Sequence, residues 1–128
     1  MLAPITAAYA AVLAILIVAL GINVTMHRVK LRVPLGDGGN AEMLRMIRLH
    51  GNAIEYTPLA VVLMLIYELN GGMHIVLQGA GVALVIGRLL QTWGMWSTER
   101  PVIGRRVGQT LTWFAIAALA VVNLLRFA

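Results

Sequence analysis

Residues 48–56 read RLHGNAIEY and stand at the head of a long apolar run. Within this segment Arg48, Asn52 and Glu55 recur at the spacing of one helix face, and Arg45 precedes them by three positions. On a helix the four side chains would occupy an arc of about 80° over about 15 Å. Ionisable side chains are costly at membrane depth, so a row of them in an apolar helix indicates a functional site.

The composition indicates a membrane protein. Of 128 residues, 60% are hydrophobic and only 12% are charged, about half the charged fraction of an ordinary soluble domain. A chain of this length cannot bury so much apolar surface in one soluble core. We therefore expect a bilayer to cover most of it.

Four membrane helices are predicted in a single domain that spans residues 1–128. They lie at about residues 4–27, 41–69, 73–96 and 105–127. The first has no basic residues before it, so it is expected to stay as a membrane helix and not to be a signal peptide. Asn40 is the predicted N-cap of the second helix, with Glu42 in its first turn. The predicted fold class is an all-α integral membrane four-helix bundle.

The distribution of basic residues predicts the orientation. They gather around the first and third connections: Arg28, Lys30, Arg32, Arg45, Arg48, Arg100, Arg105 and Arg106. The second connection has none, so the positive-inside rule places both termini outside and the basic loops in the cytoplasm. Arg126, near the C-terminus, opposes this assignment but is outnumbered.

Other chemistries fit less well. The net charge is +5, but the basic residues flank apolar segments and do not form a solvated basic face, so no nucleic-acid partner is expected. The chain has no cysteine, and any thiol chemistry needs an exogenous thiol. Its three histidines, His27, His50 and His74, lack the spacing of metal ligands, so no metal site is expected.

Several cations beside one carboxylate would suit a ligand with more than one carboxylate and one ammonium group. Arginine binds carboxylates through paired donors, Glu55 could hold an ammonium, and Asn52 can donate and accept. Glutathione has this charge pattern, as do other small zwitterions. The alternative is structural: Arg48, Glu55 and Arg88 could form buried pairs that orient the helices.

The chain resembles the MAPEG family, the membrane-associated proteins in eicosanoid and glutathione metabolism, over nearly its whole length. The matching motifs are Arg48-x-x-x-Asn52-x-x-Glu55-Tyr56 with Pro58-Leu59, Arg88-Leu89-Leu90 with Trp93-Gly94, Arg105-x-Val107-Gly108, and Leu111-Thr112-Trp113. Residues 35–40 are similar to the bacterial branch.

This resemblance implies a homotrimer that binds glutathione as co-substrate between neighbouring subunits, near the cytoplasmic side. The positions that match glutathione-binding residues are Arg28 (with Arg32 as the alternative), Arg48, Asn52, Glu55 and Arg88. Arg105 matches the catalytic arginine that stabilises the glutathione thiolate, with Arg106 as the alternative. A nearby guanidinium favours the thiolate, which is the nucleophilic form of a thiol.

The implied activity is transfer of glutathione to hydrophobic electrophiles that arrive through the membrane, with peroxidase or isomerase chemistry on the same thiolate as variants. Family members with eicosanoid activity often carry tyrosine or histidine where this chain has Gln91 and Met95, so the substrate stays open. The competing class is a non-enzymatic small membrane transporter or helix-bundle partner. The expected location is a bacterial inner membrane.

Overall fold

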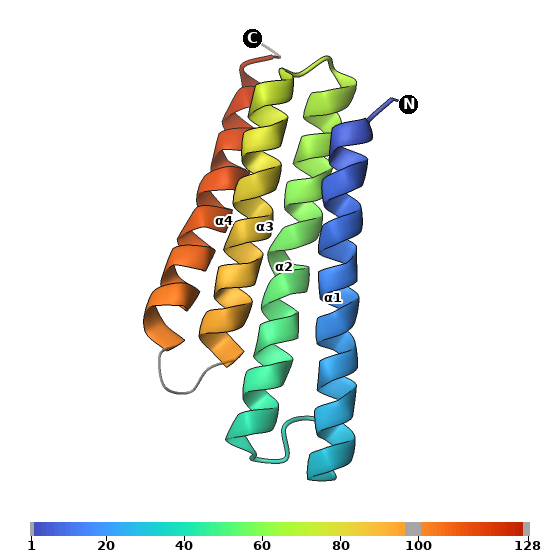
Figure 1. The fold of residues 1–128 in the computed structure, drawn as a ribbon, viewed down its shortest axis with the longest axis vertical. Coiled ribbons are helices and arrows are strands. Elements are labelled where there is room, and N and C mark those ends of the chain that lie inside the picture. The colour runs from blue at the N-terminus through green and yellow to red at the C-terminus, as the bar shows by residue number, and fades with distance from the viewer. Residues whose placement is uncertain (1, 97–100, 127–128) are drawn as a thin grey trace.

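The computed structural model describes residues 2–96 and 101–126, with the backbone alone at residues 101 and 102. Over these residues the chain forms four α-helices: α1 (Pro4–Leu31), α2 (Ala41–Leu69), α3 (His74–Trp96) and α4 (Pro101–Leu124) (Figure 1). Successive helices run in opposite directions, and both ends of the chain lie at one end of the bundle. We call this the terminal end, and the opposite end, which holds the α1–α2 connection, the loop end. The predicted all-α four-helix bundle is confirmed.

All four helices are long and apolar enough to cross a membrane. Their outward faces carry large apolar side chains; on α1 these include Ile15 at 71% and Val29 at 76% exposure. Exposed apolar rows of this kind are typical of helices that face lipid or other membrane helices.

Two helix bounds differ from the sequence-based prediction. Helix α1 continues to Leu31 because residues 28–31 include no glycine or proline, and it ends where Arg32 adopts a left-handed conformation with φ of 56°. Helix α4 begins at Pro101, since proline lacks the N–H that the first turn leaves unpaired. Arg105 therefore lies inside α4 and not at its start. The predicted end of this helix, at residue 127, falls outside the described residues.

Side-chain caps fix the starts of the first two helices. The Asn40 side chain accepts a hydrogen bond from the Met43 amide at 3.0 Å, so the predicted N-cap of α2 is confirmed. At the terminal end, the Glu68 carboxylate accepts hydrogen bonds from the amides of Ile5 at 2.9 Å and Thr6 at 2.7 Å. A carboxylate is favourable at a helix N-terminus, so Glu68 ties the end of α2 to the start of α1.

The buried apolar side chains form two clusters, one in each half of the bundle. The cluster toward the terminal end comprises Leu13, Ala60, Met64, Tyr67, Leu77, Leu84, Ala115 and Leu119. The cluster toward the loop end comprises Leu20, Met46, Leu49, Ala53 and Met95. Along α3, the buried polar residues Arg88 and Gln91 lie between these clusters, so a polar layer interrupts the core.

Helices α3 and α4 pack closely along a glycine seam formed by Gly87, Gly94, Gly104 and Gly108. A Cβ added to Gly87 would lie 2.9 Å from the Gly108 carbonyl oxygen, and one added to Gly94 would overlap the backbone of Gly104 and Arg105. Small residues allow such backbone approach between membrane helices. The seam thus fixes the position of Arg105 relative to α3.

Arg126 has a structural partner at the terminal end. Its guanidinium donates hydrogen bonds to the carbonyl oxygens of Asn70 and Gly71, the latter at 2.7 Å, and lies 5.1 Å from the centre of the Tyr67 ring. The basic residue that opposes the predicted orientation therefore holds the α2–α3 turn against the end of α4.

Candidate functional site

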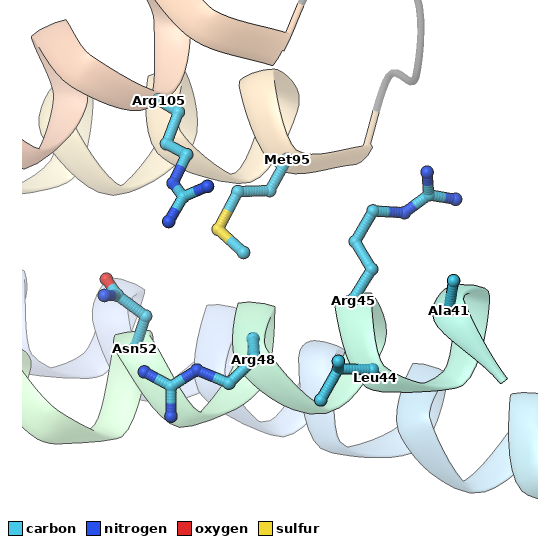
Figure 2. Close-up of a pocket in the computed structure, with 7 residues that line it drawn as sticks. All are labelled: Ala41, Leu44, Arg45, Arg48, Asn52, Met95 and Arg105. Atoms are coloured by element: carbon cyan, nitrogen blue, oxygen red, sulfur yellow. The ribbon is translucent and has the colours of Figure 1, made fainter. Parts of the chain in front are cut away.

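A cavity of about 260 Å³ opens at the loop end between α2, α3 and α4. It is lined by Ala41, Leu44, Arg45, Arg48, Asn52, Met95 and Arg105 (Figure 2). Three arginines and one asparagine thus line a single cavity, together with apolar residues. None of its lining residues within the described part of the chain is acidic.

Arg105 reaches into this cavity from α4, and Asn52 points toward it from α2 (Figure 2). Met95 of α3 lies beside Arg105 and supplies an apolar wall. The neighbouring Arg106 is exposed and does not line the cavity in the described structure. Of the two candidate catalytic arginines, the geometry favours Arg105.

Arg48 and Glu55 form an ion pair along the surface of α2, with 3.4 Å between Nη1 and Oε1. Both side chains are about half exposed, and Glu55 does not line the cavity. The pair is an i,i+7 contact within one helix, so it does not join two helices. The buried interhelical pairs expected under the structural alternative are not formed by these two residues.

Arg88 lies behind the cavity, with 2% of its surface exposed. Its Nε and Nη2 donate to the Thr112 hydroxyl at 3.1 and 2.6 Å, and its Nη1 donates to Asn52 Oδ1 at 2.9 Å. Its Cζ lies 5.9 Å from the centre of the Tyr56 ring. Among the described residues no carboxylate pairs with this guanidinium. A buried positive charge with neutral partners alone favours an anion nearby.

Two glutamines extend this polar layer. Gln91 Nε2 donates to Asn52 Oδ1, and Gln109 Oε1 accepts a weak bond from Arg88 Nη2 at 3.4 Å. Gln91 Oε1 and Gln109 Nε2 are buried without a hydrogen-bond partner among the described residues. Unpaired buried polar atoms are uncommon, and they point to water or a ligand in this layer.

Arg28 lies apart from the other predicted site residues within one chain. It borders a second cavity together with Val29, Arg32 and Pro34. Its Nη1 donates to the carbonyl oxygens of Val33 at 3.3 Å and Gly36 at 2.8 Å, so it holds the α1–α2 connection. The alternative, Arg32, lies at the same second cavity. The structure therefore brings together Arg48, Asn52, Arg88 and Arg105, has Glu55 beside Arg48, and leaves Arg28 outside.

The sequence-based site omitted residues that take part in the arrangement. Gln91 lies one turn from Arg88, and Gln109 and Thr112 lie one turn from each other on α4. The sequence contains a signal for these residues, because polar residues that are three positions apart in an apolar helix lie on one face, as the polar residues of α2 do. Arg45 belongs to the row on α2 and lines the cavity, and its buried Nε has no hydrogen-bond partner among the described residues.

Chemically, the site favours anions. Three arginines line it and Arg88 lies behind it, and the one carboxylate in the row already pairs with Arg48. Bidentate guanidinium donors bind carboxylates well, and they also stabilise a thiolate. Among the residues that the structure describes, no group of three or more His, Asp or Glu side chains is placed to hold a metal ion.

Comparisons with known proteins identify the family to which the chain belongs. The model of the MAPEG family matches residues 6–125. The chain is also 38% identical over 120 residues to the inner membrane protein YecN of Escherichia coli K12, and equally to YecN of Escherichia coli O6:H1 strain CFT073. Each alignment covers 94% of this chain and 90% of the relative. The chain is thus an integral, multi-pass membrane protein, and it belongs to the MAPEG family.

Proposed function

We propose that this protein binds glutathione in the cavity at the loop end and transfers its thiolate to hydrophobic electrophiles. The observation that carries the proposal is the meeting of Arg45, Arg48, Asn52 and Arg105 in one cavity, with the buried charge of Arg88 behind it. Family membership supports the same ligand, because the family includes glutathione transferases.

The charges of ligand and site are complementary. Glutathione has two carboxylates, one ammonium group and a thiol, so it carries a net negative charge that increases when the thiol ionises. The guanidinium groups would hold the carboxylates, and the exposed carboxylate of Glu55 lies beside Arg48 where the ammonium could be received. The row on α2 would thereby serve mainly to anchor the ligand.

We further propose that the working unit is a homotrimer in which a neighbouring subunit completes the site. A cavity of about 260 Å³ is small for an entire peptide ligand, since complete pockets usually enclose about 300–1,000 Å³. Arg28 lies outside the cavity within one chain. Contact between copies would let the Arg28 of one subunit reach the ligand held by another.

Arg105 is the proposed catalytic residue. It lies at the cavity, where its guanidinium would stabilise the thiolate that attacks the electrophile. Met95 and Leu44 give the cavity apolar walls suited to a hydrophobic second substrate. Each transfer forms a carbon–sulfur bond and expels a leaving group, or opens a strained ring, at the electrophile.

The proposed location is a bacterial inner membrane, as the name of the YecN relative states for that protein. Both termini would face the periplasm and the cavity the cytoplasmic side. This orientation follows the positive-inside rule, because Lys30, Arg32, Arg105 and Arg106 all lie toward the loop end. Cytoplasmic glutathione would then reach the cavity directly.

Calorimetric titration of the detergent-purified protein with glutathione tests the proposal. We expect saturable binding that Arg48→Ala weakens about tenfold or more, since a charge-assisted hydrogen bond to a carboxylate is worth about 1.5–3 kcal/mol. Arg106→Ala is the matched control, because it removes the same charge at an exposed position beside the site. Absence of glutathione binding by the wild-type protein, or equal loss in both variants, would overturn the proposal.

A further inference from the structure

Two donors converge on one oxygen behind the cavity. Arg88 Nη1 and Gln91 Nε2 both donate hydrogen bonds to Oδ1 of the Asn52 carboxamide, the first at 2.9 Å. A guanidinium has donors only, so the Asn52 atom that faces Arg88 must be the oxygen and not the nitrogen. This fixes the orientation of the Asn52 carboxamide by chemistry alone.

The consequence concerns the other half of the same carboxamide. With Oδ1 held by Arg88 and Gln91, the Nδ2 group is the part of this cavity-lining side chain that is left to bond a ligand. None of the described residues accepts a hydrogen bond from Nδ2. Among the described residues, the polar side chains that line the cavity are three arginines and Asn52, so the side-chain groups they offer a ligand are donors.

We infer that Arg88 and Gln91 are positioning residues that fix the Asn52 carboxamide, so that the cavity presents donors only and takes an anionic group of its ligand. That group is a carboxylate or a thiolate, and an ammonium group is excluded from this position. The inference rests on the proposed function in naming glutathione as the ligand, whereas the preference for an anion follows from the donor geometry. The sequence alone predicts that Asn52 can both donate a hydrogen bond to the ligand and accept one from it, whereas under this inference Asn52 only donates to the ligand.

Arg88 is the stronger of the two constraints. Rotating the Asn52 carboxamide by 180° would turn its N–H₂ toward a buried guanidinium, with donor facing donor and a charge left less well solvated. If the Asn52 carboxamide rotated, the side-chain amide of Gln91 could rotate as well and keep a hydrogen bond to it. Gln91 therefore constrains the Asn52 carboxamide less strongly than Arg88 does. The Oε1 atom of Gln91 is buried and has no hydrogen-bond partner among the described residues, so Gln91 bonds to Asn52 through Nε2 alone.

The variant Asn52→Asp separates positioning from packing. It keeps an oxygen that accepts from Arg88 and Gln91, but it replaces the cavity-facing N–H₂ with a negatively charged oxygen. We expect glutathione affinity to fall about 100-fold, because like charges placed together cost several kcal/mol, while the melting temperature does not fall. Asn70→Asp, the same change at the exposed terminal end, is the control. Unchanged affinity in Asn52→Asp would overturn the inference.

A double-variant comparison tests whether Gln91 acts through Asn52. Gln91→Leu removes one donor to Oδ1 and should weaken glutathione binding a few-fold in the wild-type background. In the Asn52→Ala background there is no carboxamide to orient, so Gln91→Leu should have no further effect. The same few-fold loss in both backgrounds would show that Gln91 acts in another way.

Two further ligands distinguish failure of this inference from failure of the proposed function. We expect mercaptosuccinate, a dicarboxylate thiol, to bind in a manner that Asn52→Asp abolishes, and cysteamine, a cationic thiol, not to bind. If glutathione fails to bind while mercaptosuccinate binds in this way, the proposed function is wrong and the donor-only cavity stands. Binding of cysteamine as tight as that of mercaptosuccinate, or no binding of either anionic thiol, would refute the donor-only cavity.

Discussion

Replacement of Arg88 by leucine should weaken ligand binding without destabilising the fold. A structural role predicts the opposite, because removal of a helix-orienting charge would loosen the bundle. Arg88 is 2% exposed and lies eight residues before the end of α3, about 12 Å of helix from the loop end. Its hydrogen bonds to Thr112 and Asn52 and its contact with the Tyr56 ring are all with neutral groups.

The stabilising and destabilising contributions of Arg88 nearly cancel. Burying an arginine within a membrane helix costs about 3 kcal/mol. Interhelical hydrogen bonds in membrane proteins return about 0.6 kcal/mol each, and a cation–π contact adds about 0.5–1 kcal/mol. Thr112 keeps its bond to the Gly108 carbonyl, and Asn52 keeps its bond from Gln91. We therefore expect Arg88→Leu to change the free energy of unfolding by no more than about 1 kcal/mol.

The loss of affinity should be larger. An anion bonded to Asn52 Nδ2 would lie about 7 Å from the Arg88 charge, counting two hydrogen bonds and the width of the carboxamide. At an effective dielectric constant of about 20 this separation is worth about 2 kcal/mol, which corresponds to about 30-fold in Kd. In the Arg88→Leu variant the Asn52 carboxamide is also less firmly oriented, which should weaken ligand binding further.

Thermal unfolding in detergent and calorimetric titration with glutathione measure the two effects on the same preparation. The expected result is an unchanged or slightly raised melting temperature together with an affinity about 30-fold weaker. A fall of ten degrees or more in melting temperature would refute the reasoning. It would show that Arg88 holds the helices together.

Three other predictions concern the catalytic residue, the helix packing and a helix cap. Arg105→Ala should lower the rate of conjugation to chlorodinitrobenzene at neutral pH about 10- to 100-fold. The loss of rate should become smaller as the pH rises, because the thiol then ionises without the arginine. A larger loss of rate in Arg106→Ala would assign catalysis to Arg106 instead. Gly94→Ala should destabilise the protein by about 1–3 kcal/mol in detergent unfolding, because the added Cβ overlaps the α4 backbone. Gly79→Ala is the control and should be neutral or slightly stabilising, because there is open space at its Cβ. Equal effects of the two substitutions on stability would contradict the close packing of α3 and α4. Glu68→Ala should cost about 1–2 kcal/mol through loss of the α1 cap, and an unchanged unfolding midpoint would show that the cap adds nothing.

Much of the fold could be predicted because its causes are local. Long apolar segments, the Asn40 cap and the glycines of the turns are read directly from the sequence. The end of α1 and the start of α4 differ from the sequence-based prediction, because the sequence does not show which residue will become left-handed or whether a proline stands in a loop or in a first helical turn. The left-handed conformation of Arg32 ends α1 after Leu31, and Pro101 occupies the first turn of α4.

The site could be predicted in part, for a related reason. The row on α2 follows from helical periodicity alone, but the convergence of Asn52 with Arg88 and Gln91 depends on how α2 packs against α3. One helix also cannot show that Glu55 would turn to Arg48 and away from the cavity. The glycine seam that fixes Arg105 is visible in the sequence only as scattered small residues, whose pairing across two helices requires the three-dimensional structure.

The most direct test of the central claim is an electron cryomicroscopy structure of the purified protein with glutathione bound. We predict glutathione in the cavity between α2, α3 and α4, with its sulfur beside Arg105 and a carboxylate about 3 Å from Asn52 Nδ2. Glutathione bound at another position, or this cavity empty at saturating glutathione, would contradict the account.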